Sequence, residues 1–121
     1  MAWLVDIHPE FEAEFPNMHV EVRKELFAKV KFLEKYGPLL GRPHAGTLAG
    51  SKHSNMKELR FNAVQGVWRV AFAFDTARQA ILLVAGDKSG TSEKRFYKKL
   101  IEKADARFDA HLANLEQNHA K

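Results

Sequence analysis

Three short apolar runs near the middle of the chain show the clearest pattern of hydrophobic and polar positions. They are Met56 to Asn62, Val67 to Phe74 and Gln79 to Ala85. In the second run the large apolar residues at positions 68, 70, 72 and 74 share one face of a strand, whereas Arg69 and two alanines share the other. Short turns separate the runs, so we predict three antiparallel strands with Arg69 facing away from the main core.

The remaining segments predict helices and one further strand. They are a strand at Trp3 to Ile7, a short helix at Glu10 to Phe15, a helix from a cap at Asn17 to about Tyr36, and a final helix after Thr91 or Ser92. The stretch that follows Gly37-Pro38, up to about Asn55, is rich in glycine and proline and is predicted to be a long loop. The third central run is apolar without alternation, which predicts a strand covered on both faces.

This order of elements (β-α-α-β-β-β-α) predicts an α+β fold. It would contain a small, mostly antiparallel sheet, two N-terminal helices and one C-terminal helix. A chain of 121 residues with 45% hydrophobic content is long enough for one core, so we expect a single domain over residues 1–121.

Composition then narrows the class of protein. The absence of cysteine excludes disulfides, thiolate metal sites and thiol catalysis. The six histidines show no metal-ligand spacing and there is no nucleotide-binding motif, so we expect no metal and no cofactor. We see no signal sequence and no bilayer-spanning run, and therefore expect a cytoplasmic protein without a membrane partner.

Positive charges gather on one face of the predicted sheet. Strand alternation places Arg60 beside Glu58 and on the same face as Arg69. A guanidinium group can bond two phosphate oxygens at once, and Lys88 follows the third run. With a formal net charge of +4, the pattern favours a phosphate-bearing partner. A cross-strand ion pair between Glu58 and Arg69 would explain the same charges.

Several short motifs occur in an order that resembles one known superfamily. They are Leu40-Gly41-Arg42-Pro43, Lys57-Glu58-Leu59-Arg60, Trp68-Arg69-Val70, Gly86-Asp87-Lys88-Ser89-Gly90, Phe96-Tyr97, Ala104-Asp105 and His111-Leu112. Together with the order of elements, they make nearly the whole chain similar to the RelE/ParE toxin superfamily, and within it to the phage-related, HigB-like branch. The resemblance implies a RelE-like fold and a type II toxin held inactive by a cognate antitoxin, often a helix-turn-helix protein.

The resemblance also implies an activity. Toxins of this kind are commonly endoribonucleases (mRNA interferases) that cleave mRNA on the ribosome and inhibit translation, which makes the ribosome and mRNA expected partners. The ParE side of the superfamily poisons DNA gyrase with the same scaffold, so the fold leaves the target open. A degenerate toxin that acts only as an antitoxin-binding subunit is a third possibility. The nuclease would need no metal ion, because RNA supplies its own 2′-hydroxyl nucleophile.

Three cations are assigned to catalysis through this resemblance. Arg60 and Arg69 match the family's strand arginines and are expected to hold the scissile phosphate and its developing negative charge. Lys88 matches the family's lysine after the last strand and is expected to clamp phosphate or to protonate the leaving 5′ oxygen. No histidine or tyrosine adjoins Lys88 in sequence, which leaves the general acid and base open.

Four residues are candidates for that acid and base. They are His44, His53, Asp87 and Tyr97. Histidine titrates in a useful range, but a lone loop histidine is more often simply solvated. The aspartate equally suits a turn, and the tyrosine equally suits a partly buried place at the start of a helix.

Basic residues outside the sheet are candidates for contact with RNA or the ribosome. They are Lys52, Lys57, Lys94, Arg95 and Lys98. Acidic neighbours interrupt the helical group, so a solvated helix face with local ion pairs is at least as good an explanation.

Overall fold

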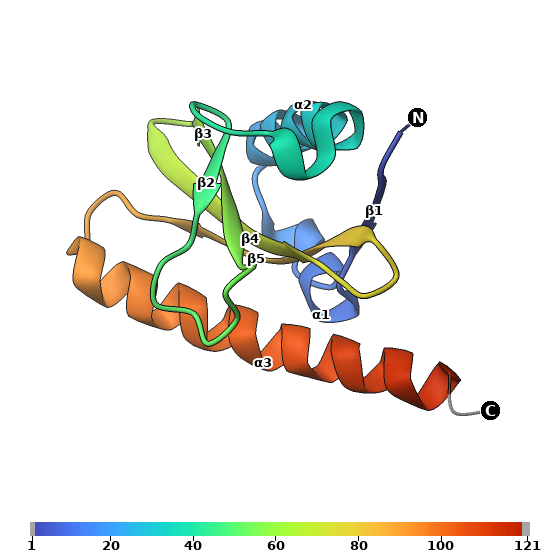
Figure 1. Ribbon diagram of the computed structural model, residues 1–121. Coiled ribbons are helices and arrows are strands. Elements are labelled where there is room, and N and C mark those ends of the chain that lie inside the picture. The colour runs from blue at the N-terminus through green and yellow to red at the C-terminus, as the bar shows by residue number, and fades with distance from the viewer. Residues whose placement is uncertain (1, 120–121) are drawn as a thin grey trace.

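The computed structural model describes residues 2–119, in which a five-stranded sheet lies between two long helices (Figure 1). The strands are β1 (Leu4–Ile7), β2 (Ala45–Thr47), β3 (Lys57–Ala63), β4 (Gly66–Phe74) and β5 (Gln79–Asp87). The helices are α1 (Pro9–Glu12), α2 (Val20–Tyr36) and α3 (Glu93–His119), with 3-10 turns at Phe15–Asn17 and Gly37–Leu39. The sheet order is β1-β5-β4-β3-β2, and β1 with β5 is the one parallel pair among these strands. The predicted α+β fold is confirmed.

Both faces of the sheet are covered by helices. On one face Leu26 of α2 belongs to the same apolar cluster as Phe72, and on the other Phe108 of α3 belongs to the same cluster as Ala71. Arg69 does face away from the cluster that contains Phe72, as predicted, but most of its own face is not open, because a second apolar cluster lies there under α3. Small alanine side chains let a helix approach the strand closely, and strand alternation cannot show whether such a face meets water or a helix.

The two N-terminal helices begin at histidine caps. The backbone N–H of Glu21 donates to Nδ1 of His19 over 3.0 Å, and His8 caps α1 in the same way. The predicted cap at Asn17 is wrong, because a 3-10 turn at Phe15–Asn17 precedes the helix and the imidazole supplies the acceptor. The same turn makes the first helix shorter than predicted.

The stretch predicted to be one long loop contains a strand. In β2, Ala45 lies opposite Leu59 of the antiparallel β3. A strand of three residues with a central glycine is too short to show alternation in the sequence. The segment after β2 descends to α3 (Figure 1), where the Ser51 hydroxyl donates to a carboxylate oxygen of Asp105. Most of the predicted loop is therefore fastened to the rest of the protein.

The unbroken apolar run in β5 has the predicted explanation. β5 lies between β1 and β4, with Leu82 in the apolar cluster under α2 and Leu83 in the cluster under α3. A strand with helices on both faces needs apolar side chains at consecutive positions, which removes the alternation.

A buried arginine connects α3 to the segment after α1. Arg107 donates to both carboxylate oxygens of Glu14, over 3.0 and 2.7 Å, and to the backbone oxygen of Leu83 over 2.8 Å. The hydrogen bonds to these acceptors compensate for the hydration free energy that the guanidinium group loses on burial. This contact joins α3 both to the segment after α1 and to β5.

Within residues 2–119 no helix is both long and apolar enough to cross a bilayer. The single domain over residues 1–121 stays a prediction, and residues 1, 120 and 121 of that range lie outside the described part.

Candidate active site

The two arginines predicted to share a sheet face are direct neighbours. Arg60 of β3 and Arg69 of β4 are paired in the antiparallel register, so their side chains leave the same face of the sheet. The Arg60 side chain is 27% exposed and the Arg69 side chain 10% exposed. Like charges placed opposite each other on adjacent strands repel, so this arrangement needs a counter-charge.

Glu58 supplies that counter-charge. Its side chain is 3% exposed, and Oε2 accepts a hydrogen bond from Arg60 Nε over 3.1 Å. The other oxygen, Oε1, lies 3.9 Å from Arg69 Nε and accepts a hydrogen bond from the Tyr97 hydroxyl over 2.9 Å. The predicted pairing of Glu58 with Arg69 is thus present as an ion pair, while the closer contact is with Arg60 on the same strand.

Arg69 is buried with part of its donor capacity unused. Its Nη1 donates to the backbone oxygen of Trp68 over 2.9 Å, whereas its buried Nε has no hydrogen-bond partner among the described residues. An unpaired buried donor costs about 1–3 kcal/mol, and such groups in native proteins often mark functional sites. Arg69 therefore carries an unused donor inside the protein, beside Arg60 and Glu58.

Lys88 reaches the same region from the end of β5. Its Nζ donates to a carboxylate oxygen of Glu93 over 2.9 Å and lies 6.0 Å from the centre of the Tyr97 ring. The hydrogen bond from Lys88 is the main reason that the pKa of Glu93 is lowered, and the charges of Arg69 and Arg60 add to the effect. The Glu93 carboxylate thus lies in the positive field of all three predicted catalytic cations.

Of the four predicted acid–base candidates, Tyr97 is the one whose side chain is hydrogen-bonded to Glu58. Burial raises the pKa of its phenol, and the hydrogen bond to Glu58 and the charge of Glu58 raise it further, against a smaller opposite effect of Arg69. The hydroxyl is therefore protonated at neutral pH and can donate a proton or a hydrogen bond.

A surface hollow of about 290 Å³ opens beside these side chains. Its lining comes from the end of β2, from β3 and from the start of α3, and comprises Thr47, Leu48, Ala49, Glu58, Arg60, Glu93 and Tyr97. Gly46 of β2 lies close to this edge, since a Cβ there would be in ordinary van der Waals contact with Arg60 Nε at 3.9 Å. The hollow gives solutes access to the Arg60 and Glu58 side chains.

The two candidate histidines lie elsewhere. His44 stacks on Phe32 of α2, with ring centres 4.6 Å apart, and its Nδ1 is 2.8 Å from Lys29 Nζ. His53 is hydrogen-bonded to Asp109 of α3 over 2.8 Å, twelve residues or about 18 Å along the helix from Tyr97. Both side chains have structural partners, and within residues 2–119 neither side chain forms a hydrogen bond or ion pair with Glu58 or the arginines. The backbone oxygen of His44 does accept a hydrogen bond from the backbone N–H of Arg60 over 2.9 Å.

Asp87 shapes the turn after β5. Its Oδ1 accepts hydrogen bonds from the backbone N–H groups of Val67 and Ser89 and from the Ser89 hydroxyl. Burial tends to raise its pKa, but these bonds outweigh burial and the pKa is lowered. This arrangement agrees with the turn interpretation of Asp87 and positions Lys88, the next residue.

The candidate RNA-binding residues are dispersed. Lys52 pairs with Asp109 on α3, and Lys57 occupies a position of β3 that alternates with Glu58 and so lies on the opposite face from the arginines. Lys94, Arg95 and Lys98 are exposed in the first turns of α3, close in sequence to Glu93 and Tyr97.

The sequence interpretation missed the roles of Glu58 and Glu93. Glu58 appeared there only as a possible ion-pair partner, although its position two residues before Arg60 already places both on one face. Glu93 carried no signal in the sequence beyond its place near a helix start. Within residues 2–119 no group of three or more His, Asp or Glu side chains is arranged to hold a metal ion.

Comparison with known proteins gives three kinds of match. Residues 13–109 match the profile of the family described as "Phage derived protein Gp49-like (DUF891)". "Putative toxin HigB2" of Mycobacterium tuberculosis is 39% identical over 122 residues, which cover 100% of this chain and 60% of that protein. "Putative toxin HigB3" of the same organism is 41% identical over 106 residues, covering 88% of this chain and 90% of that protein.

A solved structure shows the same fold at low sequence identity. It is the E. coli toxin RelE in the free state, in a mutant with two arginines replaced by alanine. The TM-score is 0.59 at 14% identity, over 85% of this chain and 97% of that chain. At this identity the match supports the fold alone. The chain spans 60% of the length of the first of the two relatives above.

Proposed function

The chain belongs to the Gp49-like family of phage-derived proteins, and we propose that it is the toxin of a type II toxin–antitoxin system that cleaves mRNA on the ribosome. The resemblance to the RelE/ParE superfamily and its HigB-like branch is confirmed by the family match, the two relatives and the fold. The names of the two relatives, both toxins, support the toxin assignment and imply an antitoxin partner. Ribonuclease activity is our proposal.

The observation that carries the proposal is the unpaired Nε of the buried Arg69. This arginine lies beside Arg60, and both contact the carboxylate of Glu58. A phosphodiester that entered this site would supply the oxygen acceptor that Arg69 Nε lacks. Guanidinium groups bind phosphate oxygens in a planar, two-pronged geometry, and they stabilise the extra negative charge of the pentacovalent transition state.

Glu93 is the group that a phosphate would replace. Its side chain is 73% exposed and is held by Lys88 over 2.9 Å. An exposed carboxylate on a flexible side chain contributes little to stability and is easily displaced. A phosphate oxygen would take over the contact to Lys88, which would then clamp the scissile group from the β5 side.

The chemistry follows from the remaining side chains. The 2′ oxygen of the RNA attacks phosphorus, the bond from phosphorus to the 5′ oxygen breaks, and the products are a 2′,3′-cyclic phosphate and a 5′-hydroxyl. Glu58 accepts the proton of the 2′-hydroxyl as general base, because its buried oxygens are the acceptors closest to both arginines. Tyr97, protonated at neutral pH, donates its proton to the leaving 5′ oxygen, with Lys88 stabilising the charge that forms there.

Exposed cations at the start of α3 extend the site. Lys94, Arg95 and Lys98 are proposed to contact ribosomal or messenger RNA phosphates, since they adjoin Glu93 along the helix. Lys52 and Lys57 are left out of this proposal, because one is paired with Asp109 and the other lies on the far face of the sheet. Removing a phosphate-binding lysine should lower the salt dependence of binding by about one unit of slope.

The test is a reconstituted translation reaction with a defined mRNA and purified full-length protein, in which 5′ ends are mapped by primer extension. We expect cuts in frame with paused ribosomes, lost in Arg69→Ala and reduced about 100-fold in Tyr97→Phe. His53→Ala is the matched control and should cut like the unaltered protein, since that side chain contacts α3 far from Tyr97. Circular dichroism confirms that each variant is folded.

Intact mRNA with undiminished translation would overturn the proposal. A supercoiling assay with DNA gyrase would then identify the other activity known on this fold. If neither target responds, a non-catalytic role in antitoxin binding is the remaining explanation.

A further inference from the structure

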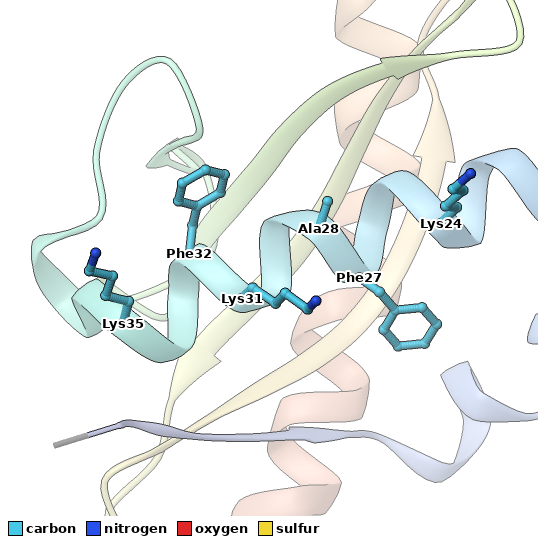
Figure 2. Close-up of a pocket in the computed structure, with 6 residues that line it drawn as sticks. All are labelled: Lys24, Phe27, Ala28, Lys31, Phe32 and Lys35. Atoms are coloured by element: carbon cyan, nitrogen blue, oxygen red, sulfur yellow. The ribbon is translucent and has the colours of Figure 1, made fainter.

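The outer face of α2 presents aromatic rings and lysines to solvent. The residues that line a surface hollow of about 600 Å³ there are Lys24, Phe27, Ala28, Lys31, Phe32 and Lys35, drawn in Figure 2 and called here the outer face of α2. This face lies opposite the buried side of the helix, which carries Val22, Leu26 and Leu33. It is therefore not part of the core and not part of the candidate active site under α3.

The three lysines form one line along the helix. Lys24, Lys31 and Lys35 follow a helical spacing of seven and four residues, so they share a face, and all three are exposed. None of them takes part in an ion pair within residues 2–119. The acidic residues of α2 fall to either side of this line. The result is a row of positive charges without an ion-pair partner in the described part of the chain, although Lys35 Nζ lies 5.4 Å from the centre of the Tyr36 ring.

The two phenylalanines flank the row and are held in place. Phe27 is 43% exposed and packs edge-on against Phe15, with ring centres 5.8 Å apart. Phe32 is 39% exposed and stacks on His44 at 4.6 Å. Figure 2 shows the two rings leaving α2 on opposite sides. Exposed rings that are already ordered lose little conformational entropy when they are covered, which is typical of binding anchors.

We propose that the outer face of α2 binds an acidic amphipathic helix of another protein. Charge complementarity identifies the occupant: carboxylates spaced along one helix would meet the lysines, and apolar side chains beside them would cover the two rings. Ala28, small and exposed between Lys24 and Lys31, lets a second helix approach closely. Lys24 and Lys35 are eleven residues or about 17 Å apart along α2, which matches about three turns of a partner helix.

A protein helix fits this face better than RNA does. Bases bind to open aromatic faces, but one face of the Phe32 ring is already covered by His44. The cations here are all lysines, which lack the planar fork that matches phosphate. The inference goes beyond the proposed nuclease and does not depend on it, because α2 and α3 cover opposite faces of the sheet.

The experiment measures binding of a fluorescein-labelled 16-residue helical peptide that carries glutamates along one stripe and leucines on both flanks. A peptide of the same composition in scrambled order controls for charge alone, and a single-stranded RNA of equal charge tests the nucleic-acid alternative. Fluorescence anisotropy with the full-length protein gives the dissociation constants. Size-exclusion chromatography of the protein alone tests whether a second copy covers the face.

We expect the amphipathic peptide to bind more tightly than the scrambled one. Lys31→Glu with Lys35→Glu should weaken its binding at least about tenfold, because two attractive contacts become repulsive. Phe27→Ala should weaken it about tenfold through loss of an anchor. Lys99→Glu with Lys103→Glu, an equal charge change on exposed positions of α3, is the matched control and should leave peptide binding unchanged.

Four results would overturn the proposal. The first is equal affinity for the amphipathic and the scrambled peptide, and the second is an equal loss of peptide affinity in the α2 and α3 double variants. The third is RNA binding that the α2 substitutions abolish, and the fourth is self-association that the same substitutions abolish. Circular dichroism of each variant shows that a loss of binding is not a loss of fold. Because mRNA cleavage is measured separately, failure of either proposal can be recognised without the other.

Discussion

Replacing Glu58 by glutamine tests whether one buried carboxylate neutralises the paired arginines. The Glu58 side chain is 3% exposed and contacts Arg60 at 3.1 Å and Arg69 at 3.9 Å. Breaking a buried ion pair by removing one partner costs about 3–5 kcal/mol. Arg60 is 27% exposed and keeps part of its hydration, so we expect a loss of about 2–3 kcal/mol in the free energy of unfolding. This corresponds to a Tm lower by roughly 10 °C.

Urea unfolding followed by circular dichroism measures this loss. Arg69→Met is the informative companion variant, because it removes one of two facing positive charges and keeps an apolar stem of similar length. Its free energy of unfolding should stay within about 1 kcal/mol of the unaltered protein. The reasoning fails if Glu58→Gln has an unchanged urea midpoint, or if Arg69→Met is destabilised as much as Glu58→Gln.

Three further predictions concern catalysis, backbone and pH. Arg69→Lys keeps the charge but loses the fork of donors, so mRNA cleavage in the translation assay should fall about 100-fold. Gly37→Ala should lower the free energy of unfolding by about 2–3 kcal/mol in urea titrations, because φ is +56° and a Cβ would collide with the Trp3 indole. The pKa of Asp75 is lowered in the folded protein, because hydrogen bonds from His111 and from the turn after β4 outweigh the opposite effect of burial. Ionised Asp75 therefore stabilises the fold above about pH 4, and this stabilisation is lost as the pH falls through the folded pKa. Asp75→Asn should therefore lower the urea midpoint at neutral pH and flatten its decline from about pH 5 to pH 3.

The sequence by itself determined four of the five strands, the order of the helices and the face that each residue of β3 and β4 occupies. Alternation in β3 and β4 correctly predicted that Arg60 and Arg69 share a face, and the unbroken apolar run correctly predicted an inner strand. These features follow from local geometry, because successive side chains of a strand point to opposite faces whatever the rest of the chain does. The strand β2 was beyond this reasoning, since three residues carry no periodic signal.

Only the tertiary structure decided which side chains complete the candidate site. The hydrogen bond from Tyr97 to Glu58 joins residues 39 positions apart and depends on how α3 is rotated against the sheet. The same packing placed His53 against Asp109, far from the arginines, although sequence made it as good a candidate as Tyr97. The rotation of α3 is set by the burial of its apolar stripe and by the Arg107 contacts to Glu14, whose free energies depend on distant partners that no local pattern encodes.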